Sequence, residues 1–281
     1  MENGIRNKVE PYFCNDQIQI FNGDCLRILP TLATNSADMV FTSPPYNTGN
    51  SGKNKDMYTE YIDDASNFNY HKLLSGMLSE SLRICKGAVF VNINYMNNSK
   101  KVLYKWLSDF SENLRENIIW DKRKVQPPIG NILGKRYEYI FLFTKDPKFE
   151  INNFKINKAE QYKKEFGNWI SNLIELDLDS ENFKYSKMHR AGFPVELPKM
   201  FMDIYTKEGD IVLDPFNGLG STPLACLMMK RKFVGTELVK KYCDITLDKL
   251  KEYDPNLQAS EIKSITVREN KPEEILSISD L

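Results

Sequence analysis

The chain has no excess of either charge, no long apolar run and no apolar segment at its start. Its 38 Lys and Arg balance its 38 Asp and Glu, so any nucleic-acid site must be a local patch rather than a global basic field. No stretch approaches the roughly 18 uninterrupted apolar residues of a membrane span, and the first residues lack a signal-peptide core. We therefore expect a cytoplasmic protein with no membrane partner.

Cysteine is also scarce and unpatterned. The five cysteines are odd in number and include no Cys-x-x-Cys pair, which argues against both a disulfide framework and a zinc site. They indicate a reducing compartment. With 41% hydrophobic residues among 281, the chain fits one large α/β domain with an insertion better than two full domains.

Strand-like and helix-like segments alternate, which favours a doubly wound, mostly parallel sheet with helices on both faces. Weak periodicity and scattered aromatics across 146–187 indicate an inserted module rather than a sheet element. The charged residues after Pro255 predict a partly disordered tail. We expect strands at 17–21, 37–42, 88–93, 116–120, 137–143, 211–214 and 233–237, and helices at 25–32, 67–85, 99–110, 196–205, 221–230 and 239–253.

The sequence Thr42-Ser43-Pro44-Pro45-Tyr46 directly follows an apolar run. A rigid diproline at a strand end, with a hydroxyl before it and an aromatic after it, suits gripping a flat ring that bears an amine. Such an amine is a poor nucleophile because its lone pair is conjugated with the ring. Hydrogen-bond acceptors on its protons localise that pair, and Ser43 Oγ and the Pro44 carbonyl are the candidates. Tyr46 is suited to stack on the base, so the pattern predicts chemistry on a nucleobase.

A second cluster runs from Asp214 to Thr222. A strand ends in an acid, two glycines allow a tight turn, and a helix then begins with its amide donors facing outward. The strand 233–237 ends in a carboxylate, Glu237, which suits ribose hydroxyls. Because the spacing is not G-x-G-x-x-G, the pattern indicates an adenosine ligand without a pyrophosphate.

Each cluster alone also has a structural explanation. A diproline can simply end a strand, and a glycine pair can simply turn the chain. Asp24 and Asp214 can act as helix N-caps. Basic residues near the site can be ordinary solvated side chains.

Together the clusters resemble the amino DNA methyltransferases, whose signatures are a [D/N/S]-P-P-[Y/F] catalytic tetrapeptide and an F-x-G-x-G methyl-donor loop. Here these are Ser43-Pro44-Pro45-Tyr46 and Phe216-Asn217-Gly218-Leu219-Gly220. The catalytic segment comes first, which is the order of the circularly permuted beta group. Segments 22–26, 136–143 and 189–198 are similar to further segments of the family.

The resemblance implies a Rossmann-like methyltransferase fold. Residues 1–145 would form the catalytic half, 146–186 a target-recognition insertion, 187–255 the half that binds S-adenosylmethionine, and 256–281 a tail.

The same resemblance implies roles at the donor site. Asp24 would accept a hydrogen bond from adenine, Asp214 would pair with the methionine ammonium, and Glu237 would hold the ribose. The remaining donor-site residues would be Phe216, Gly218, Gly220, Ser221 and Thr222.

The expected substrate is double-stranded DNA, with the target base flipped out of the helix. Residues 47–63 resemble a mobile lid, and the insertion is the expected place of sequence readout. The candidates for phosphate contact are Lys122, Arg123, Lys124, Lys135 and Arg136.

We predict a site-specific DNA methyltransferase, with a restriction endonuclease as a candidate functional partner. The serine of the tetrapeptide favours cytosine N4 over adenine N6, and the His-x-Ala-x-Phe-Pro form at 189–194 agrees with this choice. Adenine N6 stays open as the alternative. A protein amide methyltransferase and a non-catalytic nucleic-acid binding module are the remaining hypotheses.

Overall fold

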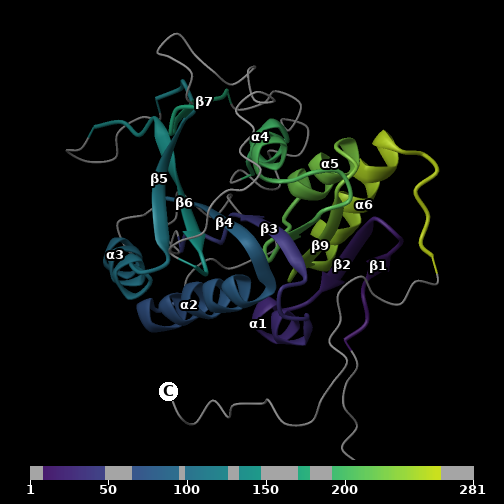
Figure 1. Ribbon diagram of the computed structural model, residues 1–281, viewed down its shortest axis with the longest axis horizontal. Coiled ribbons are helices and arrows are strands. Elements are labelled where there is room, and N and C mark those ends of the chain that lie inside the picture. The colour runs from purple at the N-terminus through teal and green to yellow at the C-terminus, as the bar shows by residue number, and fades with distance from the viewer. Residues whose placement is uncertain are drawn as a thin grey trace, which may run out of the picture.

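The computed structural model describes residues 9–47, 65–94, 99–125, 133–146, 170–177 and 192–260. Within them, a nine-stranded sheet of order β1-β2-β9-β8-β3-β4-β6-β5-β7 forms the centre of the fold (Figure 1). The strands are β1 Phe13–Cys14, β2 Ile18–Asn22, β3 Ala37–Thr42, β4 Cys85–Ile93, β5 Leu114–Asp121, β6 Tyr137–Thr144, β7 Leu173–Glu175, β8 Ile211–Asp214 and β9 Lys232–Glu237.

The middle of the sheet is parallel and its ends are mixed. Strands β2, β9, β8, β3 and β4 run parallel to one another. The β4–β6, β5–β6 and β1–β2 pairs are antiparallel, while β7 adds to β5 in parallel. The prediction of a mostly parallel α/β sheet is confirmed.

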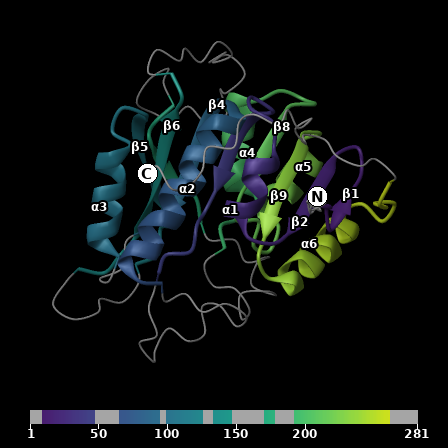
Figure 2. The same cartoon turned by 90° about the horizontal axis from the view of Figure 1, so that it is seen from below.

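Helices cover both faces of the sheet. Helices α1, α2 and α3 lie on one side and α4, α5 and α6 pack on the other, and Figure 2 looks onto the side of α2 and α3. The helices are α1 Cys25–Ile28, the 3₁₀ turn η1 Leu29–Thr31, α2 Asn67–Ile84, α3 Lys100–Asp109, α4 Glu196–Tyr205, α5 Ser221–Met228 and α6 Lys240–Tyr253.

The alternation of side chains along each strand creates two cores. Val40 and Val89 pack toward α2, whereas Phe41 and Phe90 pack toward α4, where Phe90 and Phe201 stand 4.5 Å apart between ring centroids. Because both faces are covered, the central strands are apolar throughout, as expected for buried parallel strands. All five cysteines are free and buried, and they pack as small apolar residues.

Two elements differ from the sequence prediction. The helix expected over 25–32 ends at Ile28 and continues as a 3₁₀ turn, because Pro30 has no amide hydrogen to donate. Residues 173–175 form strand β7, although 146–187 is predicted to contain no sheet element. A strand of three residues is too short to show a period. Residues 147–169 and 178–191, and the tail from 261, lie outside the described residues.

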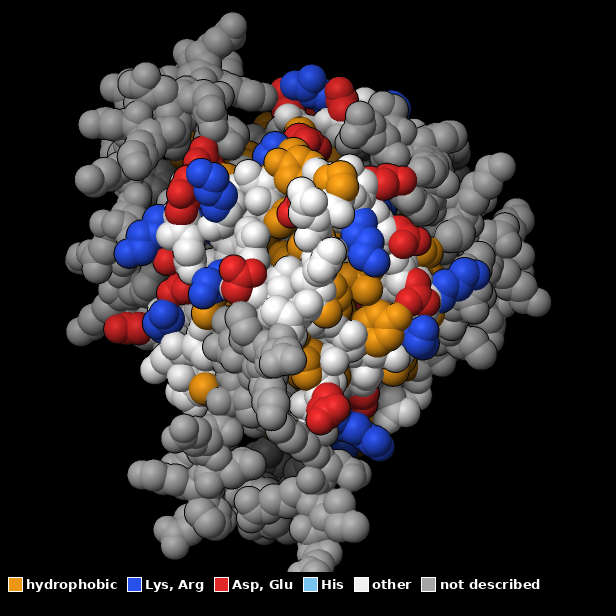
Figure 3. All heavy atoms as spheres, turned by 90° about the vertical axis from the view of Figure 1, so that its right-hand side faces the viewer, with side chains coloured by type: hydrophobic (Ala, Val, Ile, Leu, Met, Phe, Trp, Pro, Cys, Tyr) orange, Lys and Arg blue, Asp and Glu red, His pale blue; other side chains and the backbone are white. Residues whose placement is uncertain are grey.

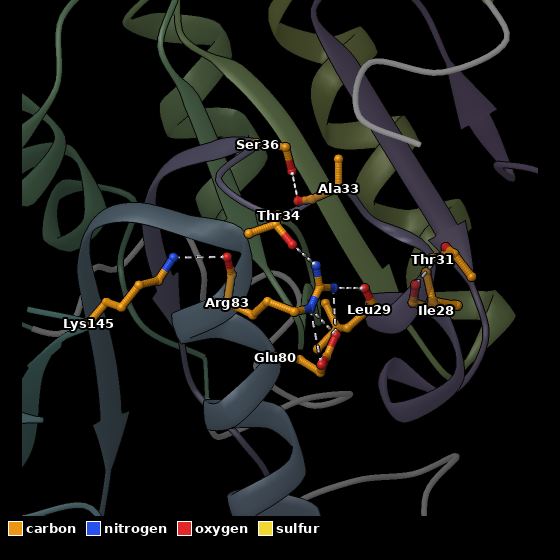
Figure 4. A network of polar contacts seen from close by, with 9 residues as sticks. All are labelled: Ile28, Leu29, Thr31, Ala33, Thr34, Ser36, Glu80, Arg83 and Lys145. Carbon is orange, nitrogen blue, oxygen red and sulfur yellow. Dashed lines mark hydrogen bonds and ion pairs between the residues drawn. The ribbon is translucent and has the colours of Figure 1, made fainter. Parts of the chain in front are cut away.

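The amino edge of the sheet is tied to α2 by a polar network (Figure 4). The Arg83 guanidinium pairs with Glu80 at 2.6 Å and donates to Thr34 Oγ1 at 3.1 Å and to the Leu29 carbonyl at 3.0 Å. Lys145 Nζ donates to the Arg83 carbonyl at 3.2 Å. These bonds hold the segment before β3 against the end of α2, at the edge opposite the strand ends that carry the predicted site.

The surface mixes both charges. On the side shown in Figure 3, basic and acidic side chains alternate over the described residues without one sign dominating. Lys240 and Asp244 on α6 form an exposed ion pair at 3.4 Å. Searching the described helices finds none that is long and apolar enough to cross a bilayer.

Arg83→Met tests the network at the amino edge. The variant removes the cationic partner of Glu80 and one of the two donors to the Leu29 carbonyl, so we expect the free energy of unfolding to fall by about 1–3 kcal/mol in urea titrations. Lys105→Met is the control, because its ion pair with Asp109 is 65% exposed on the lysine side and should contribute little to stability. Equal losses in the two variants would contradict a special role for Arg83.

Candidate functional site

The predicted catalytic and donor segments leave neighbouring strands at the same edge. Strand β3 lies between β4 and β8, and the ladder pairs Val40 with Leu213. The chain leaves β3 for β4 through α2 on one face, and leaves β8 for β9 through α5 on the other. Such a point, where the order of a parallel sheet reverses, opens a crevice beyond the carboxyl ends of the strands.

Asp214 joins the two segments. Its side chain is fully buried and accepts hydrogen bonds from Thr42 Oγ1 at 2.6 Å, Thr222 Oγ1 at 2.6 Å and the Phe216 amide at 3.0 Å. Burial raises the pKa of this carboxyl to about 6, while these three donors oppose the rise. The carboxylate therefore braces the start of the catalytic segment against the predicted donor loop, residues 214–222.

Two glycines allow the tight turn of the donor loop. Gly218 and Gly220 have φ values of 52° and 80°, a region that favours glycine. A Cβ on Gly220 would lie 2.7 Å from the Thr246 side chain, so only glycine fits there. Helix α5 follows, and Ser221 Oγ donates to the Phe193 carbonyl at 2.8 Å. The loop is thus held to α6 and to the segment before α4.

Glu237 closes the other side of the donor loop. The side chain is nearly buried, and its two oxygens accept hydrogen bonds from the amides of Gly218 and Val239, both at 2.8 Å. Burial raises the pKa of this carboxyl to about 7. Each oxygen keeps a further lone pair, so the carboxylate has capacity for ligand hydroxyls.

Asp24 lies beside Glu237 at the same edge. Asn22 at the end of β2 pairs in register with Glu237, and the Gly23 amide donates to the Glu237 carbonyl at 2.9 Å. Asp24 Oδ1 accepts from the Leu26 amide at 2.9 Å and caps α1. Asp24 is therefore a helix N-cap in this structure, while its contact with adenine stays a prediction.

The catalytic tetrapeptide is anchored from two helices. Tyr70 Oη on α2 donates to the Pro45 carbonyl at 2.8 Å, and Ser99 Oγ, just before α3, donates to the Tyr46 carbonyl at 3.1 Å. Ser43 is half-buried at the crevice side of this anchored turn. Since Tyr70 uses the Pro45 carbonyl, the Pro44 carbonyl remains the natural second acceptor for an amine.

Tyr46 differs from its predicted role. Its ring is only 3% exposed and belongs to the core cluster beneath α2, where its Oη donates to Glu138 Oε2 at 2.9 Å. Stacking on a base would require this packing to open, so the structure gives Tyr46 a supporting position.

Phosphate contact by Lys122 stays a prediction, although its side chain is less accessible than the sequence indicates. Its side chain is 11% exposed and forms an ion pair with Glu138, with the ammonium 4.9 Å from the Trp120 ring centroid. The run of basic residues at 122–124 indicates solvated side chains. Only the fold shows that Lys122, which directly follows β5, is buried.

The other four basic candidates lie where β5 ends and β6 begins. Arg123 is 47% exposed and pairs with Glu175 at 2.8 Å, and Arg136 is 52% exposed and pairs with Asp121 at 2.7 Å. Lys124 is exposed and Lys135 half-buried, and burial lowers the pKa of Lys135. Contact of these residues with DNA stays a prediction.

Several predicted features lie outside the described residues. These are most of the lid and the segment around His189, together with most of the recognition insertion. The base of the lid is described: Asn47 and Ala65 exchange hydrogen bonds of 2.9 and 2.8 Å.

The sequence analysis missed three polar residues that support the site. Thr42 binds Asp214, while Asn92 and Glu138 lie near the Tyr46 hydroxyl. A signal existed for the last two, since each is a buried polar residue next to the apolar run of its strand.

Comparisons with known proteins agree with this geometry. A family model described as DNA methylase, for N6 and N4 methyltransferases, matches residues 37–248. The Type II methyltransferase M.HinfI of Haemophilus influenzae is 27% identical over 90% of this chain and 73% of its own length. M.HpaI of Haemophilus parainfluenzae is 29% identical over 81% of this chain and 72% of its own.

Solved structures show the same fold. The PvuII DNA methyltransferase, described as cytosine-N4-specific, superposes with a TM-score of 0.66 at 19% identity and covers 89% of this chain and 91% of its own. The M1.HpyAVI–SAM complex superposes with a TM-score of 0.55 at 20% identity, covering 83% of this chain and 99% of its own.

Asp214→Asn tests the buried carboxyl through the pH dependence of stability. The folded-state pKa of about 6 exceeds the ordinary 3.8, so the folded protein binds the proton more tightly and protonation stabilises it. The unfolding free energy of the native protein minus that of the variant should therefore fall by about 3 kcal/mol as the pH rises from about 4 to about 7. Denaturant titrations across this range measure it, and a flat difference would contradict the buried, raised carboxyl.

Proposed function

We propose that this chain, which belongs to the DNA methylase family, methylates the N4 amine of cytosine in double-stranded DNA. The protein is a DNA methyltransferase that uses S-adenosylmethionine. One observation carries the assignment of the site: Thr42, next to Ser43, is hydrogen-bonded at 2.6 Å to Asp214 at the start of the donor loop. This bond brings an amine-binding turn and a nucleotide-binding turn to one crevice.

We assign the chain to the permuted beta group with a Ser-Pro-Pro-Tyr tetrapeptide. The tetrapeptide at 43–46 precedes the donor loop at 214–222, which is the order of that group. The choice of cytosine rests on Ser43, and the fold likeness to the cytosine-N4-specific PvuII enzyme is in keeping with it.

The reaction needs little from the protein beyond positioning. Ser43 Oγ and the Pro44 carbonyl accept hydrogen bonds from the amine, which localises its lone pair on nitrogen. The anchored diproline holds both acceptors before the base arrives, so little reorganisation remains. Bound S-adenosylmethionine supplies an activated methyl group. Serine is too weak a base to take the amine proton beforehand, so the proton leaves to water after transfer.

The residues of the donor loop fit the nucleoside part of such a cofactor. The nearly buried Glu237 carboxylate accepts from ribose hydroxyls, and Asp24 accepts from adenine. Phe216 lines the pocket, while Gly218 and Gly220 allow close approach of the backbone. Asn217 Oδ1 is buried without a hydrogen-bond partner in the described structure, which leaves an acceptor available in the loop.

Asp214 acts in our proposal as a brace for this loop. Its Oδ2 accepts one hydrogen bond, from Thr222, and so keeps a lone pair for the methionine ammonium, the partner predicted from sequence. Ser221 and Thr222 contribute through the helix start that they form.

DNA would approach the crevice from the exposed basic residues of β5 and β6. Exposed ion pairs are weak, so Arg123 and Arg136 can exchange their carboxylate partners for phosphates. Lys124 and Lys135 would extend this patch. The Type II names of the relatives favour pairing with a restriction endonuclease.

The identity of the product tests the base. DNA methylated by the purified protein and digested to nucleosides should yield N4-methylcytosine in mass spectrometry, and N6-methyladenine as sole product would overturn the choice of cytosine.

Ser43→Ala tests the catalytic assignment. Losing one acceptor should lower kcat by about 10²- to 10³-fold, while the affinity for S-adenosylmethionine stays unchanged. Single-turnover assays and calorimetry measure the two quantities. Ser108→Ala is the control, because this serine is exposed near the end of α3, and we expect both quantities to be native. A Ser43→Ala enzyme with native kcat would remove Ser43 from the reaction.

Glu237 predicts a pH-dependent affinity for the cofactor. Ribose hydroxyls donate to the ionised carboxylate, whose pKa is about 7 in the free protein. The dissociation constant for S-adenosylmethionine should therefore rise about tenfold as the pH falls from about 8 to about 6. Glu237→Gln should bind more weakly and show no such dependence. Calorimetry over this range tests the idea, and a native affinity independent of pH would contradict the ribose contact.

A further inference from the structure

A chain of polar contacts runs inward from Ser43. Its Oγ lies 3.3 Å from Tyr46 Oη, which lies 2.9 Å from Glu138 Oε2. The other oxygen of Glu138 pairs with the Lys122 ammonium. Asn92 Oδ1 stands farther from Tyr46 Oη, at 3.4 Å. The chain links the turn after β3 to β6 and to the residue that follows β5.

The charge at the inner end sets the direction of these hydrogen bonds. Glu138 is ion-paired with the Lys122 ammonium, and a carboxylate in such a pair only accepts hydrogen bonds. The single proton of the Tyr46 hydroxyl then goes to Glu138. Tyr46 Oη is left as an acceptor toward Ser43, so the Ser43 hydroxyl donates inward.

This orientation suits the amine acceptor. With its proton directed to Tyr46, Ser43 Oγ turns its lone pairs toward other donors. If the order were reversed, the Ser43 proton would need a different acceptor and would compete with an incoming amine for space and direction.

Stability alone is a poor explanation for the ion pair. Glu138 and Lys122 side chains are each 11% exposed, and an apolar pair of similar volume often stabilises a protein as much as a buried ion pair does. The pair also lies at the catalytic edge of the sheet, directly behind the tetrapeptide. A fixed negative charge at this place orients the hydroxyl proton of Tyr46 toward Glu138.

We propose that Glu138, held by Lys122, is a positioning residue that orients the Ser43 hydroxyl through Tyr46. The inference deepens the proposed function, since it rests on Ser43 as an acceptor of the target amine. Glu138 itself touches Tyr46 and Lys122 and acts on the reaction only through them.

Glu138→Gln is the first test. Lys122 should keep the amide oxygen of the new side chain, which leaves the amide NH₂ facing Tyr46 Oη. Tyr46 then accepts at that position and its proton turns toward Ser43 Oγ or Asn92 Oδ1, at 3.3 and 3.4 Å, so the Ser43 hydroxyl no longer faces a fixed acceptor. We expect kcat to fall about 10- to 100-fold, while KM for DNA and the dissociation constant for S-adenosylmethionine change by less than about twofold. A kcat within about twofold of native would overturn the proposal.

The double variant E138Q/K122M separates orientation from packing. Without the ammonium, the amide can rotate and present its oxygen to Tyr46, so most of the lost kcat should return. Persistent loss in a double variant that binds S-adenosylmethionine normally would count against the proposal. The variant also removes the unpaired buried charge left by E138Q alone, which protects folding.

Tyr46→Phe provides a coupling test. The substitution cuts the chain, so E138Q should lower kcat no further in this background, whereas a purely structural role would lower it equally in both. Tyr139→Phe is the matched control. Tyr139 follows Glu138 on β6, so its side chain lies on the opposite face of that strand, and its hydroxyl contacts that of Tyr137 at 3.3 Å. We expect its kcat to be native.

The outcomes distinguish this inference from the proposed function. If Ser43→Ala retains native kcat, the catalytic assignment of Ser43 fails and the role of Glu138 falls with it. If Ser43→Ala loses activity and E138Q does not, only the role of Glu138 is wrong.

Discussion

The fold places its chemistry through one buried carboxylate. Asp214 accepts from Thr42 at the end of β3 and from Thr222 at the start of α5, so it fixes two turns that lie 172 residues apart along the chain. Without it, the catalytic turn and the donor loop would be neighbours only through their strands. Three donors and full burial hold the Asp214 side chain in one position, so both turns at the strand ends are held in place as well.

Placing carboxylates in this way is unfavourable to folding. Burial raises the pKa of Asp214 to about 6 and that of Glu237 to about 7, so the ionised forms are destabilised near neutral pH. The Glu138–Lys122 pair adds two more buried charges at the same edge. The apolar cores on both faces of the sheet offset this cost, which leaves the edge polar and preorganised.

Much of the fold could be predicted because its strands and helices carry clear patterns. The strand over 211–214 and the helix over 196–205 match the expected bounds, and the two motifs at 43–46 and 214–222 do meet. The burial of individual side chains could not be predicted, because it depends on packing between elements that are distant in the sequence. Tyr46 looked exposed in the sequence, but α2 covers it. Lys122 looked solvated, but its partner Glu138 lies on a different strand, 16 residues later.

Strand β7 gives the region between β6 and α4 a particular kind of attachment. Within the described part of this region, three residues pair with β5 as Ile119–Leu173, Trp120–Ile174 and Asp121–Glu175. Pairing at a sheet edge is made by backbone amides and carbonyls, so it depends little on which side chains are present. The segment can therefore diverge or be exchanged between relatives as a cassette, provided that a short extended stretch remains to dock on β5. On the prediction that this segment reads the DNA sequence, such an exchange would change the recognition sequence and leave the strand ends that carry the two motifs intact.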